Sequence, residues 1–317
     1  MSVVRKEIKN NQSSKYLKIG LAYGIPLLFF TWAFHYINTH PQDFLKLFSL
    51  PLTSLLLLVL IQILSVWVSS LFTYVMVKPY GINLNFHEYF GITTIARSLN
   101  IILPMKGGAA VRGIYLKKQH GLSFTHFSAI FAGQSLLTLA VASLLGLIGI
   151  IWLYLQTGEI DKFGLSTFSF TSLFFFSVIV WSPKLRTYNN KVIQTLKNVL
   201  DSWALLRKDR IVIFNIIVIS VLNTVLSSVS IALIFHAINT PQPLGTLLFL
   251  GGTQDLMYQV SLTPGALGIV EASTVFFGSN ISISVSDALL VALVNRTSIL
   301  LVSGILSPVY FYHLFKK

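Results

Sequence analysis

Five ionisable residues stand in strongly apolar surroundings in the chain: Arg97, Arg112, Asp255, Glu271 and Arg296. A charge at the centre of a membrane-spanning helix costs roughly 2.5 to 3.5 kcal/mol, so each of these residues needs a physical reason to be there. Guanidinium groups bind phosphate through two parallel hydrogen bonds. The arginines therefore indicate an anion site, and phosphate head groups are the anions that a bilayer supplies.

Internal ion pairing is the alternative interpretation of the same residues. Arg296 lies ten residues into the last apolar stretch and could pair with Glu271 or Asp255, which would hold the two halves of the chain together. The arginines outnumber convenient acidic partners. We therefore interpret the arginines as ligand groups, and Asp255 and Glu271 as gating or ion-pairing residues.

Residue patterns of common enzymes and metal sites are absent from the sequence. It contains no Gly-x4-Gly-Lys-Ser/Thr phosphate loop, no His-Glu-x2-His and no Gly-x-Ser-x-Gly. The chain has no cysteine, and its seven histidines show no paired ligand spacing. We therefore expect no catalytic activity, no metal and no cofactor.

The composition places the chain in the membrane class. Hydrophobic residues make up 54% of its 317 residues and charged residues only 10%, against roughly 25% charged residues in soluble domains. A helix of about 20 apolar residues crosses a hydrocarbon core of about 30 Å. Stretches of suitable length and composition lie at 18–37, 52–77, 123–155, 166–182, 211–238 and 286–314. We expect an all-α polytopic membrane protein with six to eight transmembrane helices.

The basic residues gather in alternate loops, and this distribution predicts the orientation of the chain. Of the 23 Lys and Arg residues, 20 precede the first crossing, follow the second or the fourth, or end the chain. Positive charge concentrates on the cytoplasmic side of membrane proteins, so we expect both termini in the cytoplasm and the chain in the inner membrane. The net charge of +13 then requires no nucleic-acid partner. Apolar residues at helical spacing in 192–206 predict an amphipathic interfacial helix.

The order of apolar segments repeats in two halves, 1–155 and 166–317, of a single membrane domain, 1–317. In each half two crossings precede a Gly/Pro-broken segment, at 78–122 or 239–285, and a long crossing follows it. Three crossings precede the second half, so the halves have opposite orientations, as in transporters with a substrate site between inverted repeats. Alternatively, any six crossings divide into two groups of three, and each broken segment is either a re-entrant hairpin or a pair of full crossings.

Similar residues interrupt the two broken segments. Residues 100–112 read NIILPMKGGAAVR and residues 261–271 read SLTPGALGIVE, so each has a proline, then a glycine, then a charged residue seven or eight positions after the proline. Such breaks free backbone groups, and a helix that restarts after a break directs N–H groups toward anions. The predicted helix breaks are Pro104, Gly107, Pro264, Gly265 and Gly268.

These motifs resemble the lysylphosphatidylglycerol synthase transmembrane-region family, and the resemblance spans nearly the whole chain. The block from Thr263 to Ala272 is its more specific part. The matching residues are Asn100, Pro104, Gly108, Arg112, Leu116, Pro264, Gly265, Gly268, Glu271, Ala292 and Arg296. The chain departs from the family pattern at Gln134 and Ser135, where many members carry an acidic and a basic residue, and at Ala266, where a glycine is usual.

The resemblance implies a membrane domain that moves phospholipid, in the best-known members aminoacylated phosphatidylglycerol, from the inner to the outer leaflet. No residues for the synthase domain of those members follow Lys317, so lipid aminoacylation is not expected. We expect a flippase for a phospholipid or lipid-linked anion. Its predicted binding residues are Arg97, Asn100, Lys106, Gly108, Arg112 and Arg296. A membrane enzyme or subunit acting on polyprenyl-phosphate-linked sugars and a non-catalytic scaffold are the alternative functions, and a homodimer is compatible with the sequence.

Overall fold

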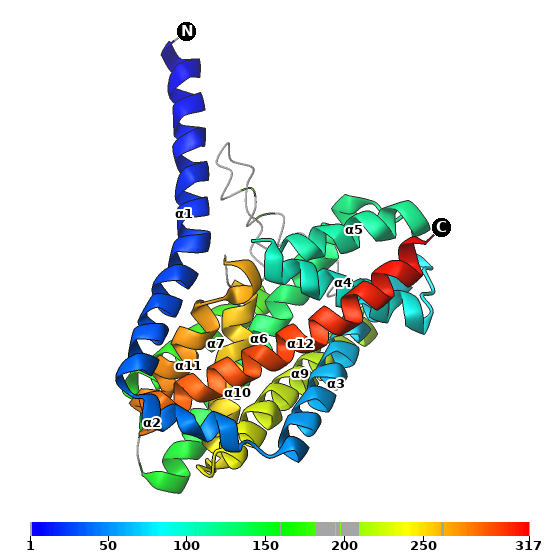
Figure 1. Ribbon diagram of the computed structural model, residues 1–317. Coiled ribbons are helices and arrows are strands. Elements are labelled where there is room, and N and C mark those ends of the chain that lie inside the picture. The colour runs from blue at the N-terminus through cyan, green and yellow to red at the C-terminus, as the bar shows by residue number, and fades with distance from the viewer. Residues whose placement is uncertain are drawn as a thin grey trace.

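The computed structural model describes residues 2–104, 106–158, 160–181, 194, 197, 209–260 and 263–316. Every regular element in these ranges is a helix, which confirms the all-α prediction (Figure 1). The amphipathic helix predicted at 192–206 lies outside the described residues, apart from positions 194 and 197.

Among the described residues, five helices are long and apolar enough to cross a membrane. They are α3 (Leu52–Val77), α6 (Phe124–Thr157), α7 (Lys162–Trp181), α9 (Arg210–Ala237) and α12 (Val285–Phe315). These helices correspond to five of the six predicted crossings. The remaining one, 18–37, falls within α1 (Ser2–Thr39), which contacts α11 and stands at one edge of the bundle (Figure 1).

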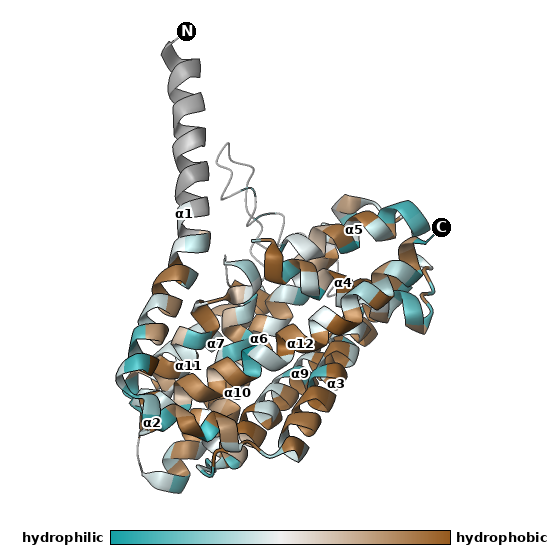
Figure 2. Cartoon of the chain, viewed as in Figure 1, coloured by the Kyte–Doolittle hydropathy of each residue, from teal (hydrophilic) through white to brown (hydrophobic). Residues whose placement is uncertain are grey.

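Large apolar side chains cover the outer faces of these helices, as Figure 2 shows along α3 and α9. On α7, for example, Phe170, Leu173 and Trp181 are each at least 70% exposed. An apolar exterior of this extent is unfavourable in water and favourable against lipid chains. The chain is therefore a multi-pass membrane protein.

Both segments predicted to be broken consist of two short helices separated by an interruption. The first contains α4 (Phe86–Ile102) and α5 (Gly107–His120), and the second contains α10 (Leu244–Val260), the 3-10 turn η3 (Pro264–Ala266) and α11 (Ile269–Asn280). The longest of these helices has 17 residues, which gives a length of about 25 Å. Each helix is therefore shorter than the roughly 30 Å hydrocarbon core.

Helices from the two halves of the chain are interleaved. The first helix of each broken segment packs against the long helix that ends the other half, α4 against α12 and α10 against α6, while α3 packs against α9. Glycines bring α6 and α10 into backbone contact. A Cβ atom added to Gly252 would lie 2.8 Å from the Cα of Gly146, and one added to Gly149 would lie 2.4 Å from the backbone nitrogen of Phe249.

Charged residues join elements at the two ends of the bundle. After α1 come α2 (Pro41–Phe44) and the 3-10 turn η1 (Leu45–Ser49), where Lys46 forms a 2.7 Å ion pair with Asp287 in the first turn of α12. At the start of α4, Glu88 caps the helix and also contacts His120, the last residue of α5, at 3.1 Å. This second contact closes the α4–α5 hairpin at its open end.

Candidate functional site

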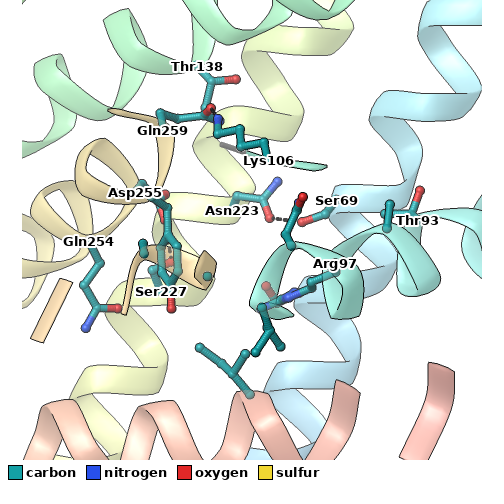
Figure 3. A pocket seen from close by; sticks show the side chains of 18 of the residues that line it. Ser69, Thr93, Arg97, Lys106, Thr138, Asn223, Ser227, Gln254, Asp255 and Gln259 are labelled. Carbon is teal, nitrogen blue, oxygen red and sulfur yellow. Dashed lines mark hydrogen bonds between the residues drawn. The ribbon is translucent and has the colours of Figure 1, made fainter. Parts of the chain in front are cut away.

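The two helix breaks meet at one cavity of about 280 Å³. Lys106 from the first break and Gly265 from the second both line it, together with residues of α3, α4, α5, α6, α9, α10 and α12 (Figure 3). The volume is close to the lower end of the roughly 300 to 1,000 Å³ of small-molecule sites. A cavity of this size accommodates a small polar group.

Arg112 lies on α5 with its side chain on the cavity wall and is only 7% exposed. Its Nη1 donates a 2.9 Å hydrogen bond to the Thr73 hydroxyl, and its guanidinium carbon lies 5.5 Å and 5.4 Å from the ring centroids of Phe127 and Phe131. Its Nε–H is buried and has no hydrogen-bond partner among the described residues. No described carboxylate lies within 4 Å of it, so Arg112 is a buried cation without a counter-ion.

Two more cations face the same cavity from the α4–α5 hairpin. The Lys106 ammonium donates to the side-chain oxygen of Gln259 on α10 and lies 5.7 Å from the ring centroid of Phe131. Arg97 on α4 lines the cavity and makes no hydrogen bond or ion pair to another described residue. Arg97, Lys106 and Arg112, called the cation triad below, thus come together as the sequence predicted, without a carboxylate among them.

Arg296 differs from the triad because it is already paired. Its Nε donates to Glu271 at the start of α11, and its Nη1 donates a 2.8 Å hydrogen bond to the carbonyl oxygen of Gly265. Its guanidinium also lies 5.6 Å from the ring centroid of Tyr258. The internal ion pair considered from the sequence is therefore present, but it joins α12 to α11 within one half of the chain. Arg296 still lines the cavity, and its Nη2 has no described partner.

Asp255 on α10 is the carboxylate that lines the cavity. Its two oxygens accept hydrogen bonds of 2.6 Å from Thr224 and 2.9 Å from Ser227, both on α9. No cation of the described residues lies within 4 Å of it, so the sequence-based pairing of Arg296 with an acid applies to Glu271 and not to Asp255.

Uncharged polar side chains that sequence reasoning missed form the cavity wall opposite the α4–α5 hairpin. The Gln62 amide donates to Ser230 at 3.1 Å and to Asn295 at 3.0 Å, and Asn295 donates to the side-chain oxygen of Gln254 at 3.1 Å. These four residues are at most 5% exposed and connect α3, α9, α10 and α12. An amide such as Gln62 within a run of Leu, Val and Ile is itself a signal, because burying it is costly unless it is hydrogen-bonded.

The backbone N–H groups at the first break are hydrogen-bonded within the α4–α5 hairpin, whereas N–H groups free to face an anion were expected at a helix restart. The N–H of Gly107 donates to the Pro104 carbonyl at 3.2 Å, and the N–H of Gly108 donates to the Asn100 side-chain oxygen at 2.8 Å. The N–H of Ala109 donates to the Lys106 carbonyl. The restart of α5 thus offers none of these three donors to an anion. At the first break, the groups that remain available to an anion in the cavity are therefore side chains.

Gly108 and Asn100 stabilise this break. A Cβ atom on Gly108 would lie 1.9 Å from the carbonyl oxygen of Ala96, so only glycine permits this close approach of α5 to α4. Asn100 both lines the cavity and accepts the Gly108 N–H. The structure therefore places Gly108 in the packing of the hairpin, outside the cavity lining.

The second break contains several left-handed residues. Gly265, Ala266 and Gly268 have φ of 56°, 58° and 76°, and the N–H of Gly268 donates to Glu271 at 2.7 Å. Glu271 thus accepts hydrogen bonds from Arg296 and from the break. Of the predicted breaks, Pro264 and Gly265 lie in η3, Gly268 is the N-cap of α11, Pro104 lies between α4 and α5, and Gly107 begins α5.

The cavity is suited to an anion. Its lining contains four cationic side chains and one carboxylate, and one of the four, Arg296, is neutralised by Glu271 behind it. Three buried N–H donors of the lining have no described partner, and they belong to Arg112, Gln254 and Arg296. Charge-assisted hydrogen bonds of this kind are worth roughly 1.5 to 3 kcal/mol each.

The family model described as lysylphosphatidylglycerol synthase TM region matches residues 17–307. This range includes both helix breaks, the cation triad and the Arg296–Glu271 ion pair. No curated protein and no solved structure matches the chain. The family match covers most of the 317 residues, and the chain therefore belongs to the lysylphosphatidylglycerol synthase transmembrane-region family.

Proposed function

We propose that this protein transports a lipid with a phosphate-bearing head group between the leaflets of the inner membrane, and that it does so as a transporter and not as an enzyme. One observation carries the proposal. Arg97, Lys106 and Arg112 face one cavity and no described carboxylate lies within 4 Å of any of them. Three cations without an ion-pair partner in a membrane protein are costly, and a bound anion offsets that cost.

The chemistry of the cation triad favours phosphate over other anions. Two guanidinium groups and one ammonium present several N–H donors, and phosphate accepts bidentate hydrogen bonds from guanidinium. The unpaired Nε–H of Arg112 is buried on the cavity wall beside the Phe131 ring. A head-group phosphate there gains hydrogen bonds that water exposure does not weaken.

The arrangement of the helices supports movement between leaflets. In this proposal the two halves are inverted repeats, the termini are cytoplasmic, and the breaks are the tips of re-entrant hairpins that enter from opposite faces. The tips already touch, since Lys106 binds Gln259 and a Cβ on Gly265 would lie 3.0 Å from the Cα of Ile101. Loosening either contact opens the cavity to one side, while the lipid chains remain in the bilayer.

Reconstituted protein tests the proposal directly. Proteoliposomes with a fluorescent phosphatidylglycerol are quenched by dithionite, which reaches the outer leaflet only. Wild-type protein is expected to make the inner-leaflet lipid accessible over time. Arg112→Gln is expected to slow this at least tenfold, because roughly 1.5 to 3 kcal/mol of charge-assisted hydrogen bonding is lost. Lys78→Gln is the matched control, because Lys78 is an exposed cation outside the cavity lining.

Two results would contradict the proposal. The first is equal transport by wild type, Arg112→Gln and empty liposomes, with and without a membrane potential. The second is conversion of a polyprenyl-phosphate-linked sugar to product by wild-type protein that moves no lipid, which would establish the membrane enzyme instead.

A further inference from the structure

Asp255 differs from the other carboxylates that the structure places near cations. Glu271 pairs with Arg296, Asp287 with Lys46 and Glu88 with His120, whereas no described cation lies within 4 Å of Asp255. Asp255 also lines the cavity and Glu271 does not. A carboxylate inside a membrane protein without a counter-ion is costly in its ionised form and much less so when it is protonated.

The two partners of Asp255 suit both of its protonation states. Thr224 and Ser227 donate their hydroxyl protons to separate carboxylate oxygens, at 2.6 Å and 2.9 Å. A hydroxyl has one donor and two acceptor positions, and its hydrogen rotates freely. If Asp255 gains a proton on the oxygen that faces Thr224, the Thr224 hydroxyl accepts the new O–H and donates its own hydrogen to the Ser220 carbonyl at 3.3 Å, while Ser227 continues to donate. Neither state therefore leaves a buried polar atom without a partner.

The cations that line the same cavity as Asp255 are Arg97, Lys106, Arg112 and Arg296. Arg97 on α4, which Figure 3 labels together with Asp255, is the cation that acts electrostatically on the carboxylate. Tyr258 is the titratable neighbour on α10 itself. From α11 comes Glu271, which Arg296 of α12 already neutralises. The cavity residues of α6 and α9 are uncharged, and η3 (Pro264–Ala266) has no titratable residue. Arg97 is thus the charged group that favours the ionised form of Asp255, in addition to the Thr224 and Ser227 hydroxyls.

We propose that Asp255 is a proton-binding site and that it takes up one proton when the lipid phosphate enters the cavity. This inference rests on the proposed function. A phosphate on Arg97 neutralises the cation that favours ionised Asp255 and adds negative charge in a medium of low dielectric constant. The proton comes from water on the side of entry, resides on a carboxylate oxygen and leaves on the side of release. Lipid and proton therefore move together, and a proton gradient drives the lipid toward the side of higher pH.

Linkage gives the sign of the pH dependence. If lipid binding adds a proton to Asp255, then protonation of Asp255 strengthens lipid binding by the same factor. Phosphatidylglycerol affinity is expected to rise as the pH falls, by up to tenfold per pH unit over the range in which free Asp255 is ionised and lipid-bound Asp255 is protonated. Asp255→Asn resembles the protonated form and is expected to bind the lipid with an affinity that does not follow pH.

The test measures two quantities on detergent-solubilised protein. Binding of a fluorescent phosphatidylglycerol is titrated between pH 5 and pH 9, and proton uptake on binding is followed with a pH indicator in weak buffer. Wild type is expected to show the pH slope and the uptake of up to one proton per lipid bound, and Asp255→Asn to show neither. Asp287→Asn is the control, because its partner Lys46 is outside the cavity lining, and it is expected to keep both.

The outcomes separate this inference from the proposed function. Lipid binding without proton uptake and without a pH slope overturns the inference and leaves the proposed function intact. Absence of phosphatidylglycerol binding at every pH overturns both. Binding that depends on sodium, tested by replacing sodium with choline at constant pH, overturns the proton site in favour of a cation site. Proton uptake is measured on the wild-type chain, so the test does not depend on the folding of any variant.

Discussion

Arg296 neutralises Glu271 and also forms part of the cavity wall. Both side chains are at most 5% exposed. Glu271 in addition accepts the N–H of Gly268, so the ion pair holds the second helix break against α12. Removing either partner leaves the other as an uncompensated buried charge.

The first prediction concerns this pair. Arg296→Ala is expected to destabilise the protein by roughly 3 to 5 kcal/mol, because truncating one partner of a buried ion pair leaves the other charge without compensation. Thermal unfolding in detergent measures the effect, and Arg296→Met combined with Glu271→Gln is expected to recover most of the loss. An Arg296→Ala protein with wild-type stability would show that Glu271 does not depend on the arginine.

Ala266 provides a second prediction at the same scale. An L-residue in the left-handed region costs roughly 1 to 2 kcal/mol, and glycine avoids that cost. The φ of Ala266 is 58°, so Ala266→Gly is expected to raise the thermal midpoint by the equivalent of about 1 kcal/mol. Ala272→Gly, at an exposed helical position of α11, is expected to lower it by a similar amount. A lower midpoint for Ala266→Gly would contradict the strained backbone.

The sequence indicated which charged residues lie at the candidate site, but it did not indicate which residues they contact. Arg97, Lys106 and Arg112 could be singled out because a charge in an apolar context is conspicuous. The pairing of Arg296 with Glu271 instead of Asp255 could not be predicted, because it depends on how η3 and α11 turn after the break. Lys106 and Ala266 both have positive φ. From the sequence alone, this backbone conformation would be expected at the neighbouring glycines.

At the scale of elements, the tightest contact between the halves is that of α6 with α10. Gly146 and Gly149 of α6 face Gly252 and Phe249 of α10, and the separation leaves no room for a Cβ atom. The related contact of α4 with α12 is looser, because a Cβ on Gly91 would meet only the side chains of Tyr310 and Leu314. At these glycines, α6 and α10 are therefore packed more closely than α4 and α12.

A glycine substitution tests the close contact of α6 with α10. Gly252→Ala would place its Cβ 2.8 Å from the Cα of Gly146 and 2.9 Å from the carbonyl oxygen of Ala142, where only backbone can yield. Overpacking of this kind costs roughly 1 to 3 kcal/mol, and a lower thermal midpoint is expected. Gly304→Ala on α12 meets nothing within 4 Å and is expected to stabilise the helix. Similar midpoints for the two variants would contradict the close packing.

The positions of the broken segments could be predicted because proline and glycine in an apolar run are strong local signals. The hydrogen bonds within the broken segments could not be predicted. The use of Asn100 as acceptor for Gly108 depends on α5 folding back against α4. The polar network of Gln62, Ser230, Gln254 and Asn295 likewise joins four helices from distant parts of the chain.

For the whole molecule, the proposed orientation is testable with single cysteines, since the natural chain has none. A cysteine at Lys118 is expected to react with a membrane-impermeant maleimide from the cytoplasmic face, and one at Lys46 from the opposite face. The expectation follows from the concentration of basic residues on the cytoplasmic side. Labelling of both positions from the same face would contradict the proposed orientation of the first half.

Lipid binding to purified protein tests whether the cation triad binds a lipid phosphate. Phosphatidylglycerol and diacylglycerol with the same acyl chains differ mainly in the phosphoglycerol group, so their affinities isolate the head group. The account predicts that wild type binds phosphatidylglycerol at least tenfold more tightly than diacylglycerol. Arg112→Gln is expected to lose most of that difference, and Lys78→Gln to keep it. Equal affinity of wild-type protein for the two lipids would contradict the account.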